Sequence, residues 1–428
     1  MKLSFAVLVA VVAATSLAIN AQSDLRPSPT PSRVVVTETI PAARTIAAPT
    51  PVPAPTQLPS RTFPVVSPSK TVSEASNLTY KGLSFAQIKN KIAEAKRQML
   101  TRPLTTASVE PIPGLPSTEP TSTAGLVRIA YYDWKLQQVD YIVISKDQFL
   151  TPDSPVTAFS TRGKPMTTRT IRANGVNTPV AVTDQDGQPE LPLLVQYPVE
   201  KNGRFVETAY YMSTHPGLIT PEVVSAGRFY VHNVIEIARD RLREHGVAIE
   251  PKVADIAERL ATVEHVDHLR FKTEYQPNIY NDIFTLYALN EGQTYRYSVS
   301  SAGAGGMVQM IPSTYSMIRN RYQSVPLMPD FVEGMRNHVN AAQAMLLYMQ
   351  MTWNDLSASP TITNAIETGI ASQEHLMAAG YNSNPAKLAG YVSRGAERWT
   401  SLIPRETQMY LQIWDSLERA VQMAPRKQ

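Results

Sequence analysis

The chain of 428 residues contains no cysteine. This absence excludes disulfides, thiolate nucleophiles and cysteine-ligated zinc or iron–sulfur sites. The sequence also lacks any run of five or six Lys and Arg residues, so we expect no nucleic-acid partner. No Gly-x-Ser-x-Gly or P-loop pattern occurs, and we expect neither a metal nor a cofactor. The formal charge of +4 is mild and suits an anionic polymer as ligand.

Only one apolar run approaches the length of a membrane span, and it lies at the N-terminus. The run covers Leu3–Ala18, follows Met1-Lys2, and is succeeded by small residues that fit cleavage after Ala18 or Ala21. This layout predicts a secretory signal peptide over residues 1–21, with an uncleaved membrane anchor as the alternative. We therefore expect an exported protein of the periplasm or cell envelope, membrane-anchored if the segment is not cleaved.

Glycine is scarce beside proline, with 19 residues against 34. Eleven of the prolines lie between residues 22 and 69, where they prevent both helices and central strands. We therefore expect a Pro/Thr/Ser-rich disordered linker over residues 22–123. One short helix, at 84–100, is predicted within it, because Ser84 begins a capping box and apolar residues then recur on one helical face.

Two folded regions are predicted after the linker, which gives an α+β chain. Residues 124–213 alternate apolar and polar side chains and predict five to seven strands of a small β-rich domain. Its turns are predicted at Asn174-Gly175, Asp186-Gly187 and Asn202-Gly203. Residues 214–428 carry helical periodicity nearly throughout and predict an all-α C-terminal domain.

A carboxylate at the end of an apolar helix is the first chemical signal. Residues such as Ile283 and Leu289 predict a buried helix that ends at Glu291. The negative end of the helix dipole and partial burial both favour the protonated carboxyl that a general acid needs. The small-residue loop at 300–312 lets backbone approach a ligand and offers the amide of Gln309. An ordinary tight turn would look the same, so the pattern alone does not decide.

The spacing around Glu291 resembles the core motif of the lysozyme-like lytic transglycosylases, the soluble lytic transglycosylase family. That motif runs Glu-Ser, then Ser, Gly-Ala-x-Gly-Leu-Met-Gln and Pro. The matching residues follow Glu291 by 9, 12, 15 and 18 positions, and they are Ser300, Gly303, Gly306 and Gln309.

Two further blocks follow in the family's order. Residues 379–385 read Ala-Gly-Tyr-Asn-Ser-Asn-Pro, and residues 404–410 read Pro-Arg-Glu-Thr-Gln-Met-Tyr. Residues 340–348 weakly resemble the helix that lies between the blocks in the family. The core motifs cover 280–415, about a third of the chain. The sequence departs from the family at Gly292, where Ser is usual, and at Met307-Val308, where Leu-Met is usual.

The resemblance implies a lysozyme-like fold for residues 214–428 and a peptidoglycan lytic transglycosylase activity. Such an enzyme cleaves the β-1,4 bond between N-acetylmuramic acid and N-acetylglucosamine and leaves 1,6-anhydromuramyl products. It implies that Glu291 acts as acid and then as base. The substrate-binding residues that it implies are Ser300, Gly306, Met307, Gln309, Tyr381 and Asn382, with Tyr381 facing Glu291. The partner is then a peptidoglycan glycan strand.

Alternatives remain open. A muramidase that admits water would use the same glutamate. A weakly active or inactive wall-binding scaffold is suggested by Gly292 and by the β-rich domain, which is expected either to shape the substrate groove or to bind a protein of the cell-wall machinery.

In the run from Glu264 to His268 the histidines are three apart, so we expect a solvated charged helix face there and no metal. Glu406 is interpreted as a structural helix-cap carboxylate.

Overall fold

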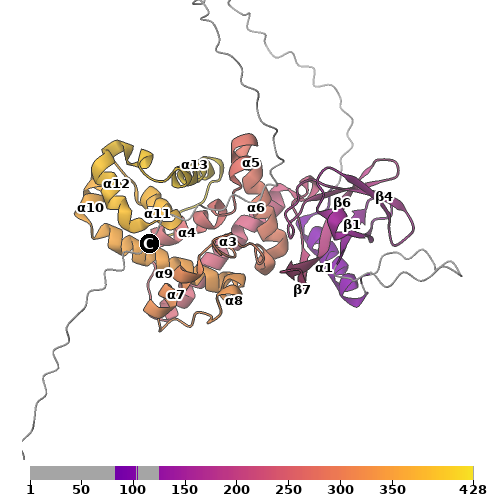
Figure 1. The fold of residues 1–428 in the computed structure, drawn as a ribbon, viewed down its shortest axis with the longest axis horizontal. Coiled ribbons are helices and arrows are strands. Elements are labelled where there is room, and N and C mark those ends of the chain that lie inside the picture. Colours follow the sequence, from indigo (N-terminus) through magenta and orange to yellow (C-terminus); the bar gives the residue numbers. More distant parts are fainter. Residues whose placement is uncertain (1–81, 103, 105–124, 428) are drawn as a thin grey trace, which may run out of the picture.

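The structure is a computed structural model that describes residues 82–102, 104 and 125–427. It combines helices with one antiparallel sheet (Figure 1). The predicted signal peptide at 1–21 and most of the predicted linker at 22–123 lie outside the described residues. Within the described residues, no helix is long and apolar enough to cross a bilayer.

The sheet has seven strands in the order β2-β1-β6-β5-β4-β3, and β7 pairs with β6. An isolated bridge between Ile142 and Ser160 brings β2 towards the opposite edge, so the sheet curves into a half-barrel. The prediction of five to seven antiparallel strands is confirmed. The strands are β1 (Leu126–Asp133), β2 (Gln138–Ser145), β3 (Pro155–Phe159), β4 (Pro165–Thr170), β5 (Val180–Asp184), β6 (Pro189–Lys201) and β7 (Arg204–Tyr211).

Two of the predicted hairpin turns join neighbouring strands. Asn202 and Gly203 both have positive φ, 53° and 71°, which is the requirement of the tight turn between β6 and β7. Gly187, with φ 74°, turns the chain between β5 and β6. The third dipeptide, Asn174-Gly175, lies in the longer connection from β4 to β5, where Gly175 has φ 63°.

Helix α1 (Phe85–Thr101) is the predicted short helix, and it packs against the sheet. Ser84 forms the expected capping box with Gln87. The buried side chains of α1 share a hydrophobic cluster with strand residues and with Ala288 and Leu289. The helix therefore covers the junction between the sheet and the helical region (Figure 1).

The helical region begins at α3 (Pro221–Glu244), which is capped by the side chain of Thr220, and Gly246 with φ 76° follows its end. The remaining α-helices are α4 (Pro251–Val263), α5 (His268–Thr273), α6 (Gln276–Asn290), α7 (Pro312–Arg321), α8 (Phe331–Arg336), α9 (His338–Ser357), α10 (Pro360–Glu367), α11 (Gln373–Asn382), α12 (Leu388–Gly395) and α13 (Arg405–Ala420); the four-residue α2 (Lys146–Phe149) belongs to the sheet.

Helix α4 lies at the centre of the helical region. It packs against α3, α6, α9, α11 and α13 (Figure 1). Ten of its thirteen residues are buried, and most of these are apolar. The buried Asp255 and Glu258 are paired with Arg426. Helix α6 instead lies between the helical region and the sheet, with α3 as its main neighbour and Ala288 and Leu289 at its end in the cluster with α1.

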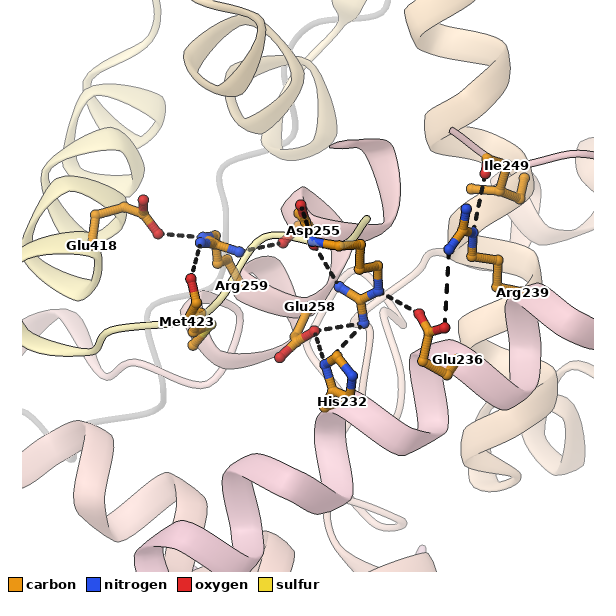
Figure 2. Close-up of polar contacts among 10 residues, drawn as sticks. His232, Glu236, Arg239, Ile249, Asp255, Glu258, Arg259, Glu418 and Met423 are labelled. Carbon is orange, nitrogen blue, oxygen red and sulfur yellow. Dashed lines mark hydrogen bonds and ion pairs between the residues drawn. The ribbon is translucent and has the colours of Figure 1, made fainter. Parts of the chain in front are cut away.

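The C-terminal segment returns across α3 and α4 through Arg426. Its guanidinium, 4% exposed, pairs with Glu236 of α3 and with Asp255 and Glu258 of α4, the last two at 2.8 and 2.6 Å. These acceptors lie close together with His232, and Arg259 reaches Glu418 nearby (Figure 2). Because three buried or half-buried carboxylates face one cation, the segment is fixed at a cost in desolvation that only the complete network offsets.

Arg426→Ala is expected to lower the free energy of unfolding by about 3–5 kcal/mol, because it leaves buried carboxylates without their cation. Urea unfolding followed by circular dichroism would measure the change. The matched control is Arg243→Ala, whose ion pair with Asp240 is exposed and is expected to contribute less than about 1 kcal/mol. Equal effects of the two substitutions would contradict this account of the C-terminal segment.

Candidate active site

Three sequence blocks resemble the transglycosylase motifs: residues 291–309 are the first block, 379–385 the second and 404–410 the third. Side-chain hydrogen bonds connect them. The Tyr381 hydroxyl, from the second block, donates to the carbonyl oxygen of Val308 in the first block at 2.6 Å. Asn382, next to it, accepts a hydrogen bond from the Thr407 hydroxyl of the third block at 2.8 Å. Segments more than 70 residues apart in sequence therefore meet at one place in the helical region.

Gln309 and Ser300 hold the loop of the first block in shape. The Gln309 amide donates to the Ser298 hydroxyl at 3.2 Å and to the Gly306 carbonyl at 2.8 Å. The Ser300 hydroxyl accepts from the Ala304 amide at 3.0 Å. Both side chains are half-buried, so they also retain polar capacity toward solvent.

Gly306 and Met307 are enclosed by protein. Gly306 has φ 67°, and a Cβ there would lie 2.2 Å from the Met335 carbonyl oxygen, so the residue is required for the approach of the loop to α8. The Met307 side chain is fully buried in the helical core. It therefore packs against other core residues and is not exposed for the substrate contact that the resemblance implied.

Glu291 lies at the end of α6, at the junction with α1. Its side chain is 50% exposed and forms an ion pair with Lys89 of α1. An ion pair is an interaction of the ionised carboxylate, whereas a proton donor must begin the reaction protonated. The hydroxyl of Tyr381, which was expected to face Glu291, is instead bonded to Val308. The structure thus joins Tyr381, Asn382 and the first-block loop, and it places Glu291 beside a different helix.

The backbone at Glu291 has φ 43° and ψ −123°, an unfavourable region for a residue with a side chain. Ala396, at the end of α12, has nearly the same conformation with φ 44° and ψ −126°. The conformation is therefore a way in which two helices of this chain end, and it does not by itself mark a catalytic residue.

A second carboxylate, Glu264, lies at the C-terminal end of α4. The Tyr410 hydroxyl, from the third block, donates to its Oε1 at 2.6 Å. Tyr381 lies near enough that the Glu264 charge contributes to raising the pKa of the Tyr381 hydroxyl well above its usual value, after the larger effect of burial. Glu264 itself is half-buried, so it keeps some access to solvent.

The surroundings of Glu264 favour its protonated form. Burial is the main cause that raises the pKa of this carboxyl to about 8; the hydrogen bond from Tyr410 lowers the pKa and the negative charge of Glu406 raises it. The position at the end of a buried helix acts in the same direction as burial, because the helix dipole presents its negative end there. A carboxyl with this pKa carries its proton at neutral pH.

The expectation of a solvated charged face from Glu264 to His268 is therefore wrong for its first two residues. Glu264 is engaged by Tyr410, and His265 contacts the Met307 carbonyl oxygen at 2.8 Å while stacking on the Tyr295 ring. The signal available in the sequence was the apolar helix that precedes Glu264, the same signal that was applied to Glu291. In the described part of the chain, no group of three or more histidine or acidic side chains is placed to hold a metal ion.

Glu406 lies in the first turn of α13, as its interpretation as a helix-end carboxylate requires. The N-cap of this helix is Pro404, which has no amide hydrogen to donate in a capping box. Its charge acts on Glu264 instead. Glu406 therefore has the helix-end position expected for it and also acts on the charge of Glu264.

Comparison with protein-family models, with curated proteins and with solved structures gives no match for this chain. The geometry of the site consequently carries the functional argument.

Gly306→Ala is expected to destabilise the protein by about 1–3 kcal/mol through overpacking against Met335 and by about 1 kcal/mol more through the left-handed backbone. Gly305→Ala is the matched control, since a Cβ at that neighbouring position meets nothing closer than 3.6 Å. Chemical unfolding of the two variants would compare them. A Gly306→Ala variant as stable as Gly305→Ala would show that the loop does not approach α8 this closely.

Glu264 is expected to make the protein less stable as the pH rises from about 4.5 to about 8. In this window the unfolded carboxyl releases its proton while the folded one retains it, so the folded state binds more protons and stability falls with pH. Each unit of pKa difference corresponds to about 1.4 kcal/mol. Glu264→Gln is neutral at every pH and should gain stability relative to wild type across this window. Unfolding curves at pH 5 and pH 8 would test this, and a constant difference would contradict it.

Proposed function

We propose that the chain is a peptidoglycan lytic transglycosylase whose catalytic site lies in the helical region at residues 214–428. The observation that supports this proposal most directly is the meeting of the three motif blocks, through Tyr381 with Val308 and Asn382 with Thr407. Blocks that form one substrate site must converge in space, whereas accidental matches along a sequence need not. The lysozyme-like character of the helical region is part of the same proposal.

The reaction requires one carboxyl group. The glutamic acid donates its proton to the glycosidic oxygen while the C1–O bond breaks, so that the leaving sugar departs as an alcohol. The resulting carboxylate then takes the proton of the muramyl 6-hydroxyl while that oxygen bonds to C1, which restores the acid and closes the 1,6-anhydro ring. Glycosidases of the usual kind need two carboxyls, about 5–9.5 Å apart. Here the substrate's own hydroxyl replaces the second.

Two glutamates are candidates for this role. The motif spacing assigns Glu291, while the arrangement of the helices brings Glu264 to the place where the blocks meet. In both cases Gln309, Ser300, Tyr381 and Asn382 are proposed to bind the sugar or to hold the groups that do, because each supplies a half-buried amide or hydroxyl. Two amides and two hydroxyls suit the acetamido groups of the glycan.

Purified peptidoglycan digested with the full chain is expected to yield 1,6-anhydromuramyl fragments, identified by mass spectrometry. The control is the same substrate incubated with buffer alone. Products that carry reducing ends would replace the proposal with a water-using muramidase. Retained binding to the wall without any soluble product would leave a scaffold protein, the alternative that Gly292 and the β-rich region suggest.

A further inference from the structure

We propose that Glu264, rather than Glu291, is the proton donor, and that Glu291 is an anchor for α1. This inference rests on the proposed function. The two residues resemble each other in sequence, because each ends a buried apolar helix. Their surroundings in the folded chain differ in three respects.

The first difference is which helices surround each candidate. Helix α4, which ends at Glu264, packs against α9, α11 and α13, the helices that carry the sequences matched to the family's later blocks. Helix α6, which ends at Glu291, packs mainly against α3 and contacts α13 through Gln276 and Tyr280 in its first turns. Its last residues, next to Glu291, instead share a cluster with α1. Because substrate must contact the matched blocks, the acid is expected on the helix that they enclose.

The second difference is the partners of each carboxyl. Glu264 has neighbours from two of the blocks, Tyr410 and Glu406 from the third and Tyr381 from the second. The first block is joined to it through His265, whose ring contacts the Met307 carbonyl. Glu291 is paired with Lys89, which belongs to none of the blocks.

The third difference is what the end of each helix does. Asn290, next to Glu291, bonds both the amide and the carbonyl of Met212, directly after β7. Glu291 then forms an ion pair with Lys89 of α1. Glu222, in the first turn of α3, accepts a hydrogen bond from the backbone amide of Phe85, also in α1. The end of α6 therefore joins the sheet and α1 to the helical region, which is a structural task.

The protonation states of the groups around Glu264 agree with this geometry. The titratable groups that face it are Tyr410 and Glu406 from α13, Tyr381 from α11 and Tyr287 from α6. Burial raises the pKa of each of these three tyrosines, so they stay neutral near pH 7. The Glu264 carboxyl can then deliver its proton to the glycosidic oxygen and recover one from the muramyl 6-hydroxyl, with no other group changing charge.

The test compares Glu264→Gln, Glu291→Gln and wild type in the full chain, by the rate of release of 1,6-anhydromuramyl fragments from purified peptidoglycan. Glu264→Gln preserves the bond from Tyr410 and is expected to lose at least about 100-fold in rate, the usual contribution of a general acid. Glu291→Gln is expected to lose no more than a few-fold. Glu244→Gln, exposed at the end of α3, is the inert control. Circular dichroism shows whether each variant is folded.

The outcomes separate the two proposals. Active wild type with a folded, active Glu264→Gln variant, or loss of activity in both glutamate variants, would overturn the assignment to Glu264. Wild type that releases no fragments would overturn the proposed function and this inference with it. If wild type releases fragments with reducing ends and Glu264→Gln releases none, Glu264 remains assigned as the proton donor, and the reaction is hydrolysis in place of transglycosylation.

A second variant guards against loss of folding in Glu264→Gln. Tyr410→Phe removes the hydrogen bond that lowers the pKa of Glu264, so the alkaline limit of kcat/KM should move to higher pH. A purely structural Glu264 would leave the position of that limit unchanged. Absence of a shift in an active Tyr410→Phe variant would therefore overturn the proposal.

Discussion

The enclosure of α4 by five other helices is the constraint on which the helical region depends. Ten of the thirteen residues of α4 are buried; most of these are apolar, and the charged ones, Asp255 and Glu258, are paired with a charge of opposite sign. Its C-terminal carbonyls and the residue that follows must then be accommodated away from bulk water. Glu264 occupies this place, which is why its carboxyl is half-buried, bonded by a tyrosine and held in its neutral form.

Burial of a carboxyl in this way costs free energy. A Gln of the same size would accept the hydrogen bond from Tyr410 equally well. The raised pKa is thus a feature that packing alone does not require. Such unfavourable arrangements gather at functional sites, although structural networks also produce them. Arg426 is an example of a structural network in this chain, since its guanidinium offsets the desolvation cost of its three carboxylate partners.

The sheet and α1 impose a second constraint, at the other end of the helical region. The sheet contributes apolar residues to a cluster that α1, α3 and the last turn of α6 complete. Glu207 of β7 forms an ion pair with Arg336 of α8 at 2.9 Å, which ties the sheet to the segment next to the first-block loop. Movement of the sheet relative to the helices would therefore disturb the loop that contains Gln309.

Much of the local structure was predictable because it depends on neighbours in sequence. The capping box at Ser84, the helix start at Thr220 and the turn at Asn202-Gly203 each follow from hydrogen bonds or positive φ angles within four residues. The apolar faces of the helices were predictable for the same reason. The burial of Met307 and the engagement of Glu264 were missed, because both depend on residues distant in sequence, such as Tyr410, which lies 146 residues after Glu264.

The sequence by itself determined the elements, their order and the presence of three blocks that resemble the motifs of one family. It could not determine which of two glutamates those blocks would surround, because spacing along the chain measures contour length and not distance. Only the packing of α9, α11 and α13 around α4 places Tyr381, Glu406 and Tyr410 beside Glu264, while α6 carries Glu291 to Lys89. The physical reason is that a carboxyl's protonation and partners are set by the atoms within a few ångströms of it, and tertiary packing chooses those atoms.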